Sequence, residues 1–258
     1  MEIECYKLEK SLNIGQKQKY SSIYPQFEKI SFFHRYPSTC FKPLFTESKT
    51  GLSGSVPNII LSTPSGKDIL LIAVHLPSKL HRDEETRNYR VCQLMEEIRF
   101  YEDQISHTRT VVVGDMNMNP FENGIASFDG FHSVMDDRVA LEEERTVFGK
   151  KNTFFYNPMW RLMGNSMQGP PGTYFYRSGE AVEFFWNTFD QVLVRPSLIG
   201  YYKEESLKII DSINGTTLLD KKGRPDKNMY SDHLPLFFEI DIESIEEDDV
   251  NGKEESLG

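Results

Sequence analysis

The sequence has few cysteines, no long apolar run and no excess of basic residues. Its three cysteines, Cys5, Cys40 and Cys92, are odd in number and widely spaced, which argues against a disulfide framework and against a cysteine-based zinc site. No stretch approaches the ~18 apolar residues that a membrane-spanning helix needs. Residues 1–7 lack the basic start and apolar run of a signal peptide. These absences predict a cytoplasmic protein with reduced thiols and no membrane insertion.

The charge balance is acidic. The chain of 258 residues has a formal net charge of −10, which argues against binding nucleic acid through a broad basic surface. A nuclease is still allowed, because a bound divalent cation can supply positive charge locally. Part of the acidity lies in residues 242–258, which lack periodicity and predict an acidic disordered tail. Residues 1–241 contain no repeat and no linker, so we expect a single domain there.

Hydrophobic patterning predicts many strands and one long helix. Two apolar runs, Asn58–Thr63 and Asp68–His75, flank the turn residues Pro64–Lys67 and indicate a β-hairpin. Apolar residues at three- and four-residue steps predict a helix over residues 84–105. Residues 111–113 form a short apolar strand. Further strands are expected at residues 173–176, 183–186, 189–194 and 234–240, the last as a buried strand.

Polar side chains lie at the ends of several of these strands. A single aspartate there is most often a turn residue or a cap, but a carboxylate beside an apolar strand is costly unless it is paired, hydrogen-bonded or metal-bound. Several such residues together indicate a site, because loops at strand ends are where scaffolds present catalytic groups. The candidates are His75, Asp115, Asn117, Asp190, Asp232 and His233.

The types of these residues fit one chemical task. Aspartate and asparagine oxygens are hard ligands that suit Mg²⁺, Mn²⁺ or Ca²⁺, and histidines suit proton transfer near neutral pH. Hydrolysis of a phosphoester needs both, because the anionic phosphate must be neutralised and a water activated. The sequence has neither a P-loop nor a phosphate-binding cysteine loop. Metal-assisted attack by water is therefore preferred over a covalent cysteine route.

Four segments carry a resemblance to a known family. In chain order they are Ile72–Ser78, Val111–Asn117, Phe189–Val194 and Ser231–Ile240. With them the chain resembles the endonuclease/exonuclease/phosphatase superfamily, which includes pancreatic-type deoxyribonucleases, abasic-site endonucleases, neutral sphingomyelinases and inositol polyphosphate phosphatases. The resemblance implies an α/β fold of the deoxyribonuclease-like kind: a four-layered sandwich of two mixed β-sheets flanked by helices, with the active site at one sheet edge.

The resemblance also implies roles around a Mg²⁺ or Mn²⁺ ion. Asp115 is expected to orient or deprotonate the attacking water, and Asn117 to hold that water or a phosphate oxygen. Asp232 is expected to be a metal ligand.

The remaining three residues are expected to act on protons and charge. His233 is a second candidate for the base or for a phosphate contact, and Asp190 is expected to orient it. His75 is expected to stabilise the pentavalent phosphorus or to assist the leaving group. The choice of base between Asp115 and His233 stays open, because the two titrations would be coupled.

One part of the family pattern is not recognisable. The family opens with a strand carrying an asparagine and a strand ending in Gln-Glu, whose glutamate is a principal metal ligand. Glu4 and Glu28 are the candidates for this glutamate. Three explanations stay open: the start of the chain is truncated, the glutamate has been lost and metal binding is weak, or the chain is a non-catalytic relative.

The substrate is the least determined feature. Trp160 and Arg161 lie in an irregular stretch where they could stack on a base or sugar and pair with a phosphate, although a packed tryptophan beside a solvated arginine is the simpler interpretation. The function that we expect is a metal-dependent phosphodiesterase or nuclease, with nucleic acid as a plausible substrate. The alternatives are a catalytically impaired binding protein and a small-molecule or inositol phosphatase.

Overall fold

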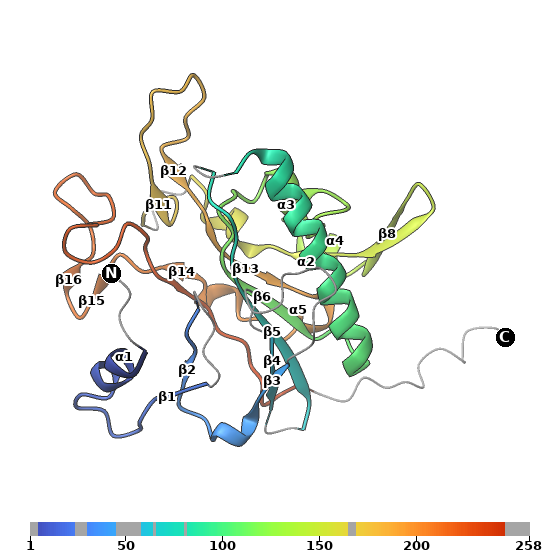
Figure 1. Cartoon of the computed structure of the whole chain (residues 1–258), viewed down its shortest axis with the longest axis horizontal. Coiled ribbons are helices and arrows are strands. Elements are labelled where there is room, and N and C mark those ends of the chain that lie inside the picture. The colour runs from blue at the N-terminus through green and yellow to red at the C-terminus, as the bar shows by residue number, and fades with distance from the viewer. Residues whose placement is uncertain are drawn as a thin grey trace.

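A computed structural model describes residues 5–23, 30–44, 58–63, 66–79, 82–164 and 169–245 (Figure 1). Seven of the described strands form one mixed sheet, ordered β3-β4-β5-β6-β13-β10-β7. These strands are β3 (Phe41–Leu44), β4 (Asn58–Ser62), β5 (Asp68–His75), β6 (Thr110–Asp115), β7 (Ser133–Val134), β10 (Phe155–Tyr156) and β13 (Asp190–Val194). The expected α/β class is confirmed.

Shorter elements surround this sheet. The helices are α1 (Cys5–Leu12), α2 (Glu84–Ile105), α3 (Asn123–Ala126), α4 (Asp137–Ala140) and α5 (Pro196–Ile199), with 3-10 turns η1 (Ser38–Cys40), η2 (Pro158–Leu162) and η4 (Glu204–Ser206). The other strands are β1 (Ser21–Ser22), β2 (Phe33–His34), β8 (Glu144–Val147), β9 (Lys150–Thr153), β11 (Tyr174–Phe175), β12 (Trp186–Asn187), β14 (Lys208–Ile209), β15 (Ser212–Ile213), β16 (Thr216–Thr217) and β17 (Leu236–Phe237).

The unit that positions the site is β5–α2–β6. Strands β5 and β6 are parallel, so the chain must cross over between them, and α2 makes that crossing. The helix begins after Asp83, whose side chain accepts a hydrogen bond from the Thr86 amide at 2.7 Å. It ends at Ser106, in the left-handed conformation with φ of 55°. The helix expected over residues 84–105 is confirmed.

The sheet is buried on both faces. Alternate residues of β5 point to opposite sides, with Leu70 and Ile72 packed toward the helix and Ile69 and Leu71 in the second cluster. On the α2 face the core includes Val91, Leu94, Met95 and Ile98 from the helix. On the other face the segments that carry β14 and β17 pack against the sheet with Leu207, Ile209, Leu236, Phe238 and Ile240. The layers are therefore helix, large sheet and a small two-stranded sheet.

The C-terminal strand is shorter than expected. Of the predicted buried strand 234–240, only Leu236–Phe237 forms a ladder, with β14, and Ile240 makes an isolated bridge with Tyr202. The partner β14 is itself two residues long, so the ladder stops there. Phe237 is also exposed, because alternate side chains of this edge segment face away from the core. Ile242 and Ile245, beyond the expected domain end, still pack in the second cluster.

Two further findings bear on the sequence expectations. The strand expected at 183–186 begins three residues later, at β12 (Trp186–Asn187), because Phe185 has a φ of 61° and breaks the extended run. Among the described residues, the structure has no helix both long and apolar enough to cross a membrane.

His132 makes stability depend on pH. Its ring is buried, stacked on Phe154 at 4.3 Å and against Phe128 at 5.0 Å. Burial, with the nearby charge of Arg145, lowers the pKa of His132 to about 4. An unfolded histidine has a pKa near 6.5, so below that pH the unfolded chain takes up a proton that the folded chain refuses. Stability is therefore expected to fall by up to about 3 kcal/mol as pH falls through this window.

The test is the slope of unfolding free energy against pH. His132→Asn removes the titrating group, and asparagine tolerates the positive φ of 53° at this position. The variant is expected to be less stable at pH 7 but to lose less stability than the parent between pH 6.5 and 4. Parallel curves for the two proteins would contradict the assignment.

Candidate active site

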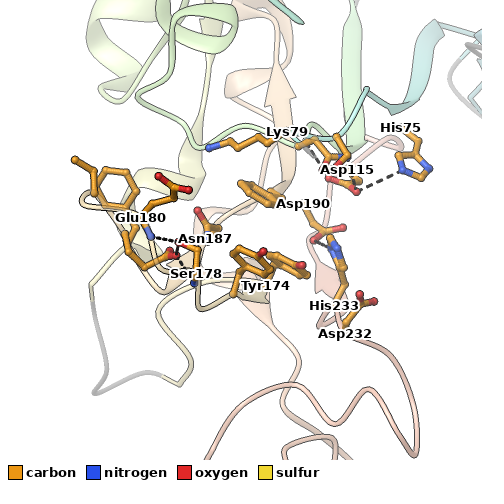
Figure 2. A pocket seen from close by; sticks show the side chains of 17 residues that line it. His75, Lys79, Asp115, Tyr174, Ser178, Glu180, Asn187, Asp190, Asp232 and His233 are labelled. Carbon is orange, nitrogen blue, oxygen red and sulfur yellow. Dashed lines mark hydrogen bonds and ion pairs between the residues drawn. The ribbon is translucent and has the colours of Figure 1, made fainter. Parts of the chain in front are cut away.

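Three candidate side chains lie in one row across the sheet. His75 is the register partner of Asp115 in the parallel pair β5–β6. Asp190, the first residue of β13, is the register partner of Asp115 in the antiparallel pair β6–β13. The carboxyl ends of β5 and β6 and the start of β13 thus meet at one sheet edge. The distance between His75 Nε2 and Asp115 Oδ2 is 3.7 Å (Figure 2).

His233 joins the row from the C-terminal segment. Its backbone forms an isolated bridge with Tyr174, and its Nδ1 lies 2.7 Å from Asp190 Oδ2. That bond leaves Nε2 available to a water or a substrate. Burial works against protonation of His233, but the hydrogen bond to Asp190 and the charges of Asp190, Asp115 and Asp232 outweigh it and raise the pKa of His233.

Asp115 is the most constrained carboxylate of the row. Its Oδ1 accepts a hydrogen bond from the Asn117 amide at 2.8 Å, and its Oδ2 accepts one from Asn117 Nδ2 at 3.1 Å. Burial, and then repulsion from the Asp190 carboxylate, raise the pKa of Asp115. A carboxyl group whose pKa moves toward neutrality suits proton transfer.

Asn117 holds the loop after β6. It adopts a φ of 49°, a region that asparagine tolerates better than most residues. Its Nδ2 donates to the Leu76 carbonyl at 2.8 Å as well as to Asp115. Both amide hydrogens are therefore engaged, and Asn117 could donate to a phosphate oxygen only by giving up one of these bonds.

The backbone at position 114, just before Asp115, has room only for a glycine. Its φ is 140°, and a Cβ built there would lie 2.1 Å from the carbonyl oxygen of Val74 on β5. Any side chain would push the two strands apart at the position next to the row.

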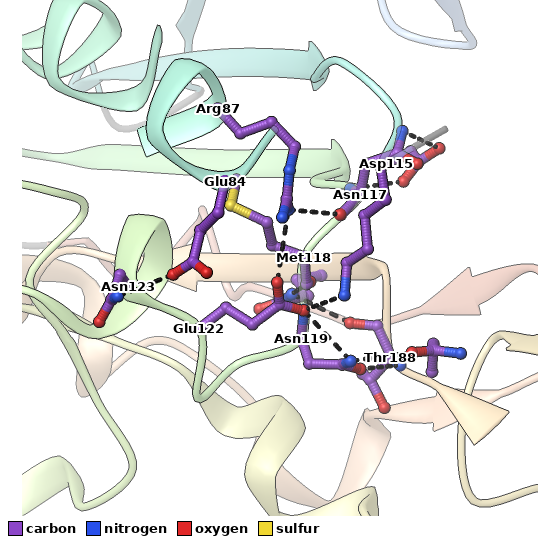
Figure 3. A network of polar contacts seen from close by, with 12 residues as sticks. Glu84, Arg87, Asp115, Asn117, Met118, Asn119, Glu122, Asn123 and Thr188 are labelled. Carbon is purple, nitrogen blue, oxygen red and sulfur yellow. Dashed lines mark hydrogen bonds and ion pairs between the residues drawn. The ribbon is translucent and has the colours of Figure 1, made fainter. Parts of the chain in front are cut away.

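A polar network ties this loop to α2 (Figure 3). Arg87 lies 3.3 Å from the Glu122 carboxylate and donates to the Asn117 carbonyl at 3.4 Å. Lys79 approaches the same carboxylate at 2.6 Å, and Glu122 also accepts from the Asn119 amide at 2.7 Å. Glu122 thus connects the helix, the segment after β5 and the loop after β6.

All six strand-end candidates line one cavity of about 840 Å³. The structure therefore brings together the residues that the sequence separates by up to 158 positions, from His75 to His233. The cavity is also lined by residues that sequence reasoning did not select: Ser78, Lys79, Tyr174, Tyr176, Ser178, Glu180, Val182, Glu183, Phe184, Asn187 and Phe189. Three of them carried a signal, since Ser78 and Phe189 lie within family-like segments and Lys79 directly follows the first of these.

Trp160 and Arg161 are not among the residues that line this cavity. Arg161 is ion-paired with Glu204 at 3.3 Å and lines a separate hollow of about 390 Å³. The Trp160 ring packs against Phe121, with centroids 6.4 Å apart.

The oxygen donors of the cavity fit a hard divalent cation. Asp115, Asp190 and Asp232 all line it. The carboxylates of Asp115 and Asp190 repel each other, and a bound cation would reduce this repulsion. No group of three or more His, Cys, Asp or Glu within the described residues could hold a metal by itself. Mg²⁺ is usually held by one or two carboxylates together with waters and substrate phosphates, so the set fits in that manner. Glu4 and Glu28 lie outside the described residues.

Sequence comparison assigns the chain to no family, since no known family profile and no curated protein matches it. Solved structures do show likeness. A conserved protein of unknown function from Enterococcus faecalis is 15% identical over 91% of this chain and 81% of that chain, with a TM-score of 0.48. A 3' phosphatase, NExo, from Neisseria, bound to a product DNA hairpin, is 12% identical over 93% of this chain and 84% of that chain, with a TM-score of 0.47.

A third solved structure, an endonuclease/exonuclease/phosphatase family protein from Bacteroides thetaiotaomicron, is 12% identical over 94% of this chain and 80% of that chain, with a TM-score of 0.45.

Proposed function

We propose that the chain is a divalent-metal-dependent hydrolase of phosphoester bonds, acting as a phosphodiesterase or nuclease with water as the nucleophile. The observation that carries this proposal is the 2.7 Å pairing of His233 with Asp190, beside the carboxyl group of Asp115, in one cavity. An imidazole oriented by a carboxylate exchanges protons near neutral pH. A second carboxyl group with a raised pKa stands next to it.

These groups divide the proton transfers of a hydrolysis. One of Asp115 and His233 takes the proton of the attacking water, and the other contacts the phosphate. Their titrations are coupled, because the charge of each shifts the pKa of the other. His75, 3.7 Å from Asp115, is half-exposed at the rim of the row, where it can stabilise the developing charge or donate to the leaving oxygen.

Mg²⁺ or Mn²⁺ is the proposed cofactor, and Asp232 is its proposed ligand within the cavity. When bound, the cation supplies positive charge to the phosphate and its leaving oxygen. Lys79, held at 2.6 Å by Glu122, adds a fixed positive charge at the other side of the cavity (Figure 2).

The test is a set of hydrolysis assays with Mg²⁺ and Mn²⁺ titrated from zero to millimolar concentration. Plasmid DNA, single-stranded DNA, RNA, phosphoinositides and a phosphomonoester are assayed side by side. We expect metal-dependent cleavage of at least one phosphodiester, abolished by a chelator. Asp232→Asn is expected to raise the metal concentration for half-maximal activity tenfold or more, as loss of a carboxylate ligand would.

Asp241→Asn is the matched control, because Asp241 lies outside the cavity and contacts Lys203 at 3.9 Å. It is expected to leave the metal requirement unchanged. Cleavage of the phosphomonoester or the phosphoinositides alone would favour the phosphatase alternative. If none of these substrates is hydrolysed, the enzyme proposal is lost, and nucleic-acid binding without turnover would favour the impaired binding protein.

A further inference from the structure

The cavity has a second wall that the hydrolytic chemistry does not use. Strands β11 and β12 form a hairpin that rises from the body of the molecule (Figure 1). Its loop is fastened by Glu183, which accepts hydrogen bonds from the Ser178 amide at 2.8 Å and the Ser178 hydroxyl at 2.6 Å. The hairpin is therefore an ordered wall beside the row, and Figure 2 shows Ser178 and Glu180 across the cavity from His75.

The two faces of this hairpin differ. Tyr174 and Tyr176, two residues apart, line the cavity, as alternation along a strand requires. Phe175 lies on the other face, where its ring contacts Trp186 at 5.4 Å and the Arg224 guanidinium lies 5.4 Å from its centroid. The packing of the outer face holds the two tyrosines on the cavity side.

The cavity-side rings form a series of nearly parallel planes. Phe189 and Tyr174 have centroids 5.3 Å apart at an interplanar angle of 21°. Tyr174 and Tyr176 follow at 6.3 Å and 11°. The series thus begins beside the catalytic row, where the Tyr174 ring is 4.7 Å from His233, and ends at Tyr176, which is 40% exposed. Phe184, another lining residue, is 54% exposed.

Exposed, preordered aromatic faces favour a flat ring as ligand. Bases of unpaired nucleic acid stack on such side chains without needing hydrogen-bond readout. A paired base within a duplex has both faces covered by its neighbours and cannot use this wall unless it is unstacked.

The charges of the same wall argue against binding of a sugar–phosphate backbone along it. Glu180 and Glu183 line the cavity on the hairpin side, whereas Lys79 is the only lysine or arginine among the described lining residues. A sugar–phosphate backbone laid along the cavity side of the hairpin would meet these carboxylates, and no lysine or arginine of the hairpin is among the described residues that line the cavity. The base, rather than the phosphates, is therefore the part of a nucleotide that this wall suits.

We propose that the β11–β12 hairpin is a stacking platform for the base of an unpaired nucleotide whose phosphoester lies at the catalytic row, with Tyr176 and Phe184 as the contacting residues. This inference rests on the proposed function and names its substrate as single-stranded or frayed nucleic acid rather than paired duplex.

The test compares three oligonucleotides of one sequence: single-stranded, annealed to its complement, and single-stranded with abasic sites that keep the phosphates but remove the bases. Binding is measured by fluorescence anisotropy without metal, and KM and kcat are measured with Mg²⁺. Tyr176→Ala is expected to weaken binding of the base-bearing single strand about 5- to 150-fold, the range of one base–aromatic stack. This loss is expected to raise KM more than it lowers kcat.

Two controls separate stacking from structure. Tyr176→Phe keeps the ring and is expected to bind within about twofold of the parent, because stacking uses the π-face rather than the hydroxyl. Tyr89→Ala removes a tyrosine on α2 that is 61% exposed and lies outside the cavity, and is expected to change nothing. The abasic strand is expected to bind the parent and Tyr176→Ala alike.

The outcomes distinguish the two proposals. If the parent binds single, paired and abasic strands equally, or if Tyr176→Ala binds the base-bearing strand as the parent does, the platform is overturned whatever the hydrolysis shows. Preferential binding of the unpaired strand with no cleavage would support the platform and overturn the hydrolase. Loss of binding in Tyr176→Phe as large as in Tyr176→Ala would also overturn stacking as the cause.

Discussion

Replacing Arg195 with methionine is expected to lower the free energy of unfolding by about 3–5 kcal/mol. Arg195 is 1% exposed and makes a two-pronged ion pair with buried Glu102, with Nε–Oε1 and Nη2–Oε2 distances of 2.9 Å. Its Nη1 donates to the carbonyls of Thr153 and Phe154. Methionine keeps much of the volume but leaves the Glu102 carboxylate buried without its cation, which is the source of the cost.

The measurement is urea unfolding of matched variants. Arg138→Met breaks an ion pair of comparable length, 2.6 Å to Asp136, in which the arginine side chain is 83% exposed, and is expected to leave the midpoint almost unchanged. In the double variant Glu102→Leu/Arg195→Met neither charge of this pair is left, so it is expected to regain part of the loss. A single variant as stable as Arg138→Met, or a double variant that loses the sum of both single losses, would contradict this account.

The position of this pair matters for the site. Arg195 directly follows β13, and its amide donates to the Thr110 carbonyl at 3.0 Å, at the start of β6. Asp115 and Asp190 lie at the opposite ends of the same two strands, in a register that pairs Val111 with Val194. The ion pair therefore stabilises the strand register on which the alignment of the two carboxylates depends.

The sequence predicted the regular part of the fold well. Helix α2 and strands β4 and β5 have strong local periodicity, and they occur where the periodicity placed them. The closing strand was predicted too long, because its length is set by a two-residue partner, β14. The pair of Glu102 and Arg195 spans 93 positions, and no local pattern connects residues that far apart.

The candidate site was likewise predictable only where local sequence patterns determine it. Polar residues at strand ends were recognisable one by one, and the register of β5, β6 and β13 explains why His75, Asp115 and Asp190 share a sheet edge. The aromatic wall was not recognisable from the sequence, since the pattern around Tyr174 and Tyr176 indicates only an ordinary strand. The nearly parallel orientation of their rings depends on the packing of the outer face of the hairpin, which only the tertiary structure defines.

Asp190→Asn is expected to reduce kcat/KM for a phosphodiester about 10²- to 10⁴-fold while the protein stays folded. Asparagine keeps the shape of the side chain that lies 2.7 Å from His233 Nδ1. It removes the negative charge that favours protonation of the imidazole, and its amide group can hold the ring in the wrong tautomer. Asp241→Asn makes the same chemical change outside the cavity and is expected to retain the parental rate.

A double variant decides whether Asp190 acts through His233. If the two residues work as one unit, His233→Gln alone already removes the imidazole that Asp190 orients. The double variant Asp190→Asn/His233→Gln is then expected to be little slower than His233→Gln. If the double variant instead loses the product of both single losses, Asp190 has a separate role, such as sharing the cation with Asp115, its register partner on β6. Metal titration of Asp190→Asn tells these apart, because only a shared ligand would raise the metal concentration needed for half-maximal activity.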